Sequence, residues 1–148
     1  RNPEGLAEAT IGKWINQEKG RREKVVIATK ITGGGRITGK NIISACEGSL
    51  KRLGTDYIDL YQFHWPARYT PQSNWGQSLS YYQQLERRAA SFEEQCEAMG
   101  KLIEQGKIRG WGSCNDNTFG LTMLAETAKR MGLPPPSSMQ NDFILINR

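Results

Sequence analysis

The polar side chains with the greatest chemical capacity in this sequence stand at the ends of predicted strands. His64, the only histidine among 148 residues, follows a run of strand-forming residues from Tyr57 to Phe63. Lys30 ends a β-branched run, and Asn115 and Gln140 lie at the ends of two shorter ones. A lysine and a histidine held together can tune and relay protons near neutral pH. Asn and Gln offer donor and acceptor groups suited to a carboxamide ligand.

Each of these side chains also has a structural interpretation that the sequence leaves open. A lone histidine is by default a hydrogen-bonded structural residue, and Lys30 can be a solvated strand end. Asn115 can be a turn residue and Gln140 a satisfied polar group. The joint arrangement is more informative, because the carboxyl ends of parallel strands lie on one side, where α/β proteins bind ligands. We therefore predict that the four side chains converge on one site.

Alternating helix and strand patterns predict the parallel βα units that would position these groups. Strands are expected at 24–30, 57–63, 107–113 and around 138–140, and the first reads as buried on both faces because its apolar run is continuous. A first helix is expected from Asn2-Pro3, burying Ala7, Ile11, Trp14 and Ile15. A second is capped by Thr38 and buries Ile43, Cys46, Leu50 and Leu53, a third has a capping box at Ser91, and a fourth includes Leu121, Leu124, Ala125 and Ala128.

Two loops need separate interpretation. The stretch from Ala67 to Ala90 has little apolar periodicity and is long for a compact domain, so we expect a loop over the mouth of the site. Gly34, Gly39 and Lys40 nearly match the P-loop spacing between a strand and a helix, but Asn41 replaces the Ser or Thr that contacts magnesium. A flexible βα loop is therefore expected there, not a nucleotide triphosphatase site.

The composition argues against several classes of function. The net charge is +5, but the basic residues are spread out and no aromatic stacking platform accompanies them, so no nucleic-acid partner is expected. No apolar run reaches the roughly 18 residues that span a bilayer, so no membrane partner is expected. Three cysteines, far apart and odd in number, argue against a disulfide framework or a metal site. They favour a reducing compartment, hence the cytoplasm, with an organelle as the alternative.

With these residues in place, the chain resembles the aldo-keto reductase family, in its Tas-like branch. The longest matching segment runs from Ser49 to Pro66 and includes Asp56-Tyr57-Ile58-Asp59-Leu60-Tyr61. Shorter matches are Val26–Lys30, Gly106–Arg109, Gly112–Asn115, Gln140–Phe143 and Ile146–Arg148. They follow one another in the family's order over nearly the whole chain.

This resemblance implies a (β/α)8 barrel that transfers hydride between NADPH and an aldehyde or ketone. Lys30 and His64 would be two members of the family's Asp–Tyr–Lys–His tetrad. In that tetrad the lysine's charge lowers the pKa of the tyrosine acid, and the histidine hydrogen-bonds near the carbonyl oxygen. Trp65 would wall the substrate pocket.

The resemblance also implies a cofactor site. Asn115 and Gln140 would hold the nicotinamide carboxamide. Cys114 stands where the family usually has serine, and a thiol is a weaker hydrogen-bond partner. The substrate, the choice of NADPH over NADH and the oligomeric state are left open.

The chain departs from the family pattern in its extent. No tyrosine lies in the context of the tetrad acid, and four predicted strands are half of a barrel of about 250 residues. We therefore expect residues 1–148 to be a partial barrel domain, strands three to six, inactive alone and prone to aggregate or dimerise through its sheet edges. The alternatives are a cofactor-sensing binding subunit of the potassium-channel beta type and an inactive truncated product.

Overall fold

The computed structural model describes residues 5–71 and 80–142. Its centre is one sheet of parallel strands in chain order, which confirms the predicted βα alternation. The strands are β1 (Ala28–Ile31), β2 (Ile58–Phe63), β3 (Ile108–Cys114) and β4 (Ser138–Gln140). Because all the strands run the same way, their carboxyl ends lie along one edge of the sheet.

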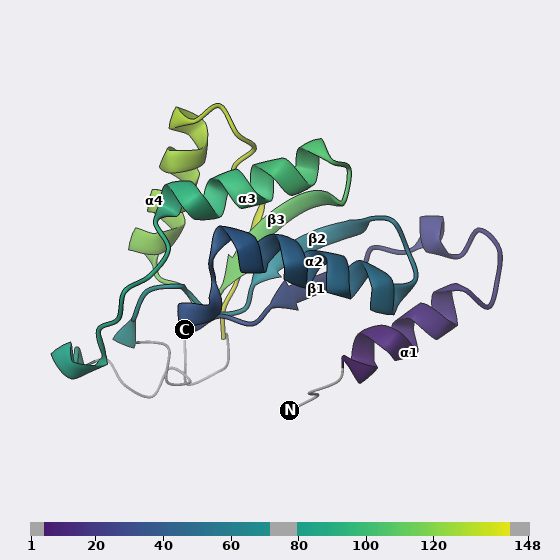
Figure 1. The fold of residues 1–148 in the computed structure, drawn as a ribbon, viewed down its shortest axis with the longest axis horizontal. Helices are drawn as coiled ribbons and strands as arrows, with labels where there is room; N and C mark the ends of the chain where they lie inside the picture. The colour runs from purple at the N-terminus through teal and green to yellow at the C-terminus, as the bar shows by residue number, and fades with distance from the viewer. Residues whose placement is uncertain (1–4, 72–79, 143–148) are drawn as a thin grey trace.

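Helices α2, α3 and α4 cover one face of this sheet, and α1 lies beside the end of α2 (Figure 1). The α-helices are α1 (Leu6–Ile15), α2 (Gly39–Leu53), α3 (Phe92–Glu104) and α4 (Thr118–Arg130). Short 3-10 helices are η1 (Arg22–Lys24), η2 (Gly34–Arg36) and η4 (Gln83–Leu85). Within the described residues, no helix is long and apolar enough to cross a membrane.

Side-chain caps fix where three of these helices begin. Thr38, Ser91 and Asn117 each accept a hydrogen bond from the backbone amide three residues on, at 3.2, 3.1 and 3.0 Å. Thr38 and Ser91 were predicted caps. The Glu94 carboxylate reaches the Gly39 amide at the start of α2, at 2.7 Å. One acidic side chain therefore ties the starts of α2 and α3 together.

The core lies between the sheet and its helices. Tyr61, Phe63 and Trp111 alternate onto the helix-covered face and are fully buried. The rings of Phe63 and Trp111 meet edge to face with centroids 5.8 Å apart.

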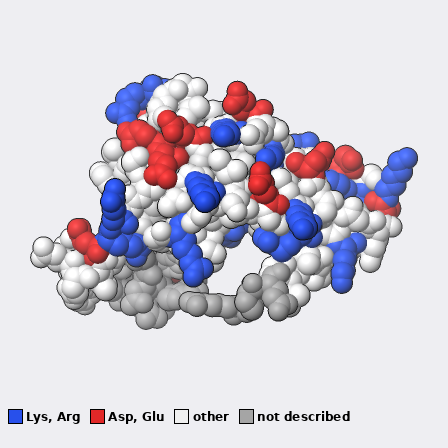
Figure 2. All heavy atoms as spheres, in the orientation of Figure 1, with Lys and Arg blue, Asp and Glu red and all other residues white. Residues whose placement is uncertain are grey.

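On the surface, Lys and Arg are interspersed with Asp and Glu on the face shown in Figure 2. The candidate site lies on the other face of the sheet, toward which Lys30 and Gln62 point.

The predicted buried face of the first helix is largely wrong. Of its four residues only Ile15 is buried, whereas Ile11 and Trp14 are 40% and 47% exposed. Helix α1 instead packs against the end of α2 through Gly12, where a Cβ would lie 2.6 Å from the Arg52 carbonyl oxygen. Close backbone approach, which apolar periodicity does not register, decides this packing. The predicted start at Asn2-Pro3 lies outside the described residues.

The first strand is also shorter than predicted and is not buried on both faces. It begins at Ala28 rather than Lys24, because residues 22–24 form η1 and Val26 is 82% exposed. The Ile27 amide donates to the Asp59 carboxylate at 2.9 Å instead of to a neighbouring strand. In α2, Cys46 and Leu53 are buried as predicted, but Ile42 is fully buried in place of the half-buried Ile43 and Leu50.

Candidate active site

A row of residues across all four strands forms the floor of the candidate site. Lys30 pairs in register with Gln62, Gln62 with Gly112, and Gly112 with Ser138. Residues in one register row point to the same face of a sheet. The Gln62 Nε2 donates to the Ser138 Oγ at 3.2 Å, passing over Gly112, where a Cβ would lie 2.2 Å from that oxygen. Glycine at this position leaves room for the crossing hydrogen bond.

The next row toward the carboxyl ends brings the other predicted site residues together. Cys114 pairs in register with Gln140, and its thiol donates to the Gln140 Oε1 at 3.6 Å. The Asn115 Nδ2 donates to the His64 carbonyl oxygen at 2.8 Å, and the Asn115 amide donates to the Gln140 carbonyl oxygen at 3.1 Å. Backbone and side chain of one asparagine thus connect the ends of β2, β3 and β4.

Asn115 has a left-handed backbone, with φ 54°, alone among the non-glycine residues that the structure describes. Asparagine tolerates this region better than most residues. Such conformations occur often at ligand sites, where the surrounding structure holds them. Here the left-handed turn directs the asparagine side chain back toward the end of β2 rather than on toward α4.

The charge of Lys30 influences both neighbouring titratable groups. Partial desolvation, and then the Lys30 ammonium, lower the pKa of the His64 imidazole below its ordinary value. Burial raises the pKa of the Cys114 thiol, and Lys30 opposes that rise. Among the residues that the structure describes, Lys30 has no carboxylate partner in an ion pair. Its charge acts instead on His64 and Cys114.

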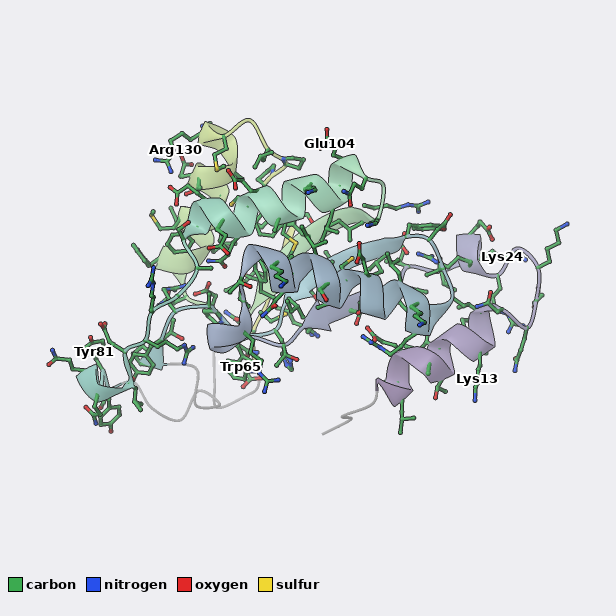
Figure 3. The ribbon with its side chains drawn as sticks, in the orientation of Figure 1. Lys13, Lys24, Trp65, Tyr81, Glu104 and Arg130 are labelled. Atoms are coloured by element: carbon green, nitrogen blue, oxygen red, sulfur yellow. The ribbon has the colours of Figure 1, made fainter. Side chains whose placement is uncertain are left out.

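Trp65 belongs to a stretch that borders the site and that we call the rim segment, residues 64–68. Figure 3 shows Trp65 in the lower part of the view, between Tyr81 on the left and Lys13 on the right. Gly33 lies directly on its backbone, since a Cβ there would be 2.2 Å from the Trp65 Cβ and 2.5 Å from its Cα. The Gly34 amide donates to the Pro66 carbonyl oxygen at 3.2 Å. The glycine loop after β1 therefore supports the rim segment.

Residues that the sequence did not single out connect the rim segment to the loop after β3. The Arg68 guanidinium donates to both carboxylate oxygens of Asp116, at 2.5 and 3.2 Å, and to the Asn117 Oδ1 at 2.8 Å. The Asp116 side chain is 3% exposed. Asp116 directly follows Asn115. An acidic residue next to a predicted site residue is a sequence signal from which Asp116 could have been identified.

Of the two loops interpreted from the sequence, the loop after β1 lies wholly within the described residues and the loop 67–90 lies only partly within them. Residues 72–79 of the predicted loop 67–90, including Trp75, lie outside them. On the remainder, the Tyr69 and Tyr81 rings lie 5.9 Å apart. In the P-loop-like stretch, the amides of Gly39 and Asn41 already donate to Glu94 and Thr38. That use of the helix-start amides by protein groups agrees with an ordinary βα loop.

No cluster suited to a metal ion occurs in the described residues. A metal site would need three or more His, Cys, Asp or Glu side chains together, and the candidate site offers one histidine and one buried thiol. Its other members are a lysine and two carboxamides. The donor set is therefore suited to an organic ligand with amide and carbonyl groups.

Comparison with known proteins gives a consistent result. The sequence profile described as the aldo/keto reductase family matches residues 3–148. An aldo-keto reductase of Babesia bovis is 37% identical over 140 residues, covering 84% of this chain and 49% of that protein. Protein tas of Escherichia coli is 36% identical over 156 residues, covering 98% of this chain and 44% of the relative. The chain spans about half the length of these relatives.

A third relative and two solved structures extend this comparison. A probable voltage-gated potassium channel subunit beta of Oryza sativa is 29% identical over 150 residues, covering 97% of this chain and 40% of that protein. A thermostable aldo-keto reductase with the inhibitor epalrestat has a TM-score of 0.66 at 27% identity, covering 94% of this chain and 41% of its own. An aldo/keto reductase of Klebsiella pneumoniae with NADP and acetate has a TM-score of 0.57 at 32% identity, covering 80% and 33%.

Proposed function

This chain belongs to the aldo/keto reductase family, and we propose that it supplies half of the active site of an enzyme that reduces an aldehyde or ketone with NADPH. The family's (β/α)8 barrel, predicted from the sequence, is confirmed as the fold to which this four-stranded segment belongs. The carrying observation is that Lys30, His64, Asn115 and Gln140 stand at the carboxyl ends of four adjacent parallel strands. Barrel enzymes have their active sites at that end.

The cofactor assignment is supported by the hydrogen-bonding capacity that remains at the edge. The side-chain Nδ2 of Asn115 donates to the His64 carbonyl oxygen, so the Asn115 Oδ1 can accept a hydrogen bond from an incoming amide. The Gln140 Oε1 is used by Cys114, which leaves the Gln140 Nε2 to donate to an incoming carbonyl. Within the described residues, this leaves one acceptor and one donor, which match the donor and acceptor of a nicotinamide carboxamide. When bound, NADPH would supply the hydride.

The catalytic assignment concerns proton transfer to the carbonyl oxygen. Lys30, half-buried and without an ion-pair partner in the described residues, would lower the pKa of a neighbouring acid by its charge. His64, kept neutral by its lowered pKa, would donate a hydrogen bond toward the carbonyl oxygen. The acid itself is proposed to come from a part of the barrel outside these 148 residues. Trp65, half-buried on the rim segment, would form a wall of the substrate pocket.

The experiment is a turnover assay on the full-length protein with NADPH and a panel of aldehydes and ketones. We expect carbonyl-dependent oxidation of NADPH, with alcohol formed in equal amount. Tight NADPH binding with no turnover of any carbonyl, at pH values from 5 to 9, would overturn the enzymatic proposal.

A cofactor-sensing binding subunit is the second candidate, favoured by the likeness to the Oryza sativa channel subunit. Such a subunit could retain every group described at this edge, so the site residues do not separate the two functions. Turnover of a carbonyl would support the enzyme, and co-purification with a membrane channel would support the binding subunit. An inactive truncated product would show neither.

A further inference from the structure

Three consecutive backbone carbonyl groups of the rim segment accept hydrogen bonds from the side chain of one residue, Arg87. The Arg87 Nε donates to the Ala67 carbonyl oxygen at 3.0 Å. Its Nη2 donates to the carbonyl oxygens of Arg68 at 3.0 Å and Pro66 at 3.5 Å. Pro66 and Ala67 are buried, and buried carbonyl groups need partners. A single side chain, twenty residues away in the chain, thus satisfies the backbone that directly follows Trp65.

The Arg87 side chain also lies beside the glycine loop that supports Trp65. A Cβ at Gly34 would lie 3.6 Å from the Arg87 Nη2, and one at Gly35 would lie 3.8 Å from its Cδ. Both are ordinary van der Waals distances. Arg87 therefore joins three segments, namely its own loop, the loop after β1 and the rim segment, at the point where the Gly34 amide also meets Pro66.

We propose that Arg87 is a positioning residue that clamps the rim segment and thereby sets the placement of Trp65 against the substrate. The Gly33 contact fixes Trp65 from one side, and Arg87 fixes the following peptide units from the other. Arg68, held by Asp116, secures the far end of the segment. The effect of this clamp on turnover rests on the proposed function, but the clamp itself does not.

Arginine is required here because of its geometry. A guanidinium presents five N–H donors in a rigid plane, so it can serve several carbonyl groups at once. A lysine ammonium has the same charge but lacks this fork. Arg87→Lys therefore keeps the positive charge but removes the guanidinium hydrogen bonds, whereas Arg87→Met removes both.

The test compares Arg87→Met and Arg87→Lys with Arg88→Met in the full-length protein. Arg88 is the adjacent residue, is exposed, and makes no hydrogen bond to the rim segment in the described structure. We expect Arg87→Met to raise KM for the carbonyl about tenfold, with kcat and the Kd for NADPH changed less than threefold, because the substrate wall is displaced and the cofactor site is not. Arg87→Lys should recover less than half of the loss, and Arg88→Met should match the wild type.

Amide hydrogen exchange provides a second readout that does not depend on turnover. Arg87→Met should speed exchange at Gly34 and across residues 67–71, whereas Arg88→Met should not. If Arg87→Met is too unstable to purify, Arg87→Lys carries both measurements. Identical KM and exchange in the Arg87 variants and Arg88→Met would overturn the proposal. Faster exchange in a protein that reduces no carbonyl would overturn the proposed function and leave the clamp standing.

Discussion

At the amino ends of the strands, the charged groups use their hydrogen-bonding capacity on one another. The Asp59 carboxylate accepts from the Ile27 amide at 2.9 Å, from Arg22 at 2.8 Å and from Arg109 at 2.9 Å. The two guanidinium groups lie 3.7 and 4.0 Å from the centre of the Tyr57 ring. At the carboxyl ends, Lys30 has no carboxylate partner in the described residues and His64 is exposed.

The difference shows how one sheet separates stability from chemistry. Burial alone would raise the pKa of Asp59, but the Ile27 amide, Arg22 and Arg109 outweigh it and hold that pKa below its usual range. Three donors already bind this carboxylate, and two of them are positively charged, so most of its hydrogen-bonding capacity is used within the protein. At the other end, the hydrogen bonds made within the described residues occupy only one side-chain polar atom each of Asn115 and Gln140. Groups left incompletely paired are those that can bind a cofactor or substrate.

The largest expected effect is at the carboxyl edge. Lys30→Met in the full-length protein should lower kcat by about 10²- to 10⁴-fold, because the acid loses the charge that tunes it. The Kd for NADPH should change little, and stability should stay within about 0.5 kcal/mol, because Lys30 forms no ion pair within residues 5–71 and 80–142. Steady-state kinetics, cofactor titration and thermal unfolding check these three quantities. Lys40→Met, at an exposed position on α2, is the control, and unchanged kcat in Lys30→Met would refute the assigned role.

The next effect falls on stability at the amino edge. Asp59→Asn should lower the free energy of unfolding by about 3 kcal/mol, because Arg22 loses its charged partner at a site where the Asp59 side chain is only 10% exposed. Since the pKa of Asp59 is lowered in the folded state, this stabilisation is present above about pH 4 and is lost as the pH falls further. Denaturant unfolding from pH 7 to pH 3 measures it. Asp56→Asn, at an exposed neighbour, should show neither effect.

A smaller effect is expected where the glycine loop supports Trp65. Gly33→Ala would place a Cβ 2.2 Å from the Trp65 Cβ, so we expect KM for the carbonyl to rise about tenfold with NADPH binding retained. Gly35→Ala is the matched control, because its Cβ would meet only the Arg87 Cδ at 3.8 Å. Substrate kinetics of the two variants decide the point. Equal KM values would mean that the contact does not set the pocket.

The smallest expected effect is a shift in one titration. The imidazole signal of His64, assigned by comparison with His64→Gln, should titrate below about pH 6.5 and move upward in Lys30→Met. Because this pKa is lowered on folding, protonation of His64 destabilises the protein only as the pH falls below the unfolded value and has no effect above it. NMR titration supplies the midpoint. A midpoint that Lys30→Met leaves in place would mean that the two groups do not interact.

Local patterns were enough to predict the parallel βα alternation, two helix caps and the convergence of Lys30, His64, Asn115 and Gln140 on one edge. These features depend on residue type and on the rule that parallel strands end on the same side. The burial of Gly12 and the Asp116–Arg68 pair were not predictable in this way. They arise where segments distant in sequence meet, and one sequence contains no periodicity that reports such contacts. The start of β1 was predicted too early, because the Ile27 amide donates to the Asp59 carboxylate and not to a backbone carbonyl of a neighbouring strand.

The most direct measurement is single-turnover transfer of deuterium from deuterated NADPH to a carbonyl substrate, in the full-length wild type and in Lys30→Met and Asp59→Asn. The account predicts that the wild type and the folded fraction of Asp59→Asn label the product carbon at similar rates, while Lys30→Met labels it at least about 100-fold more slowly. Equal rates in the wild type and Lys30→Met, or no label in any product, would contradict the assignment of chemistry to the carboxyl edge.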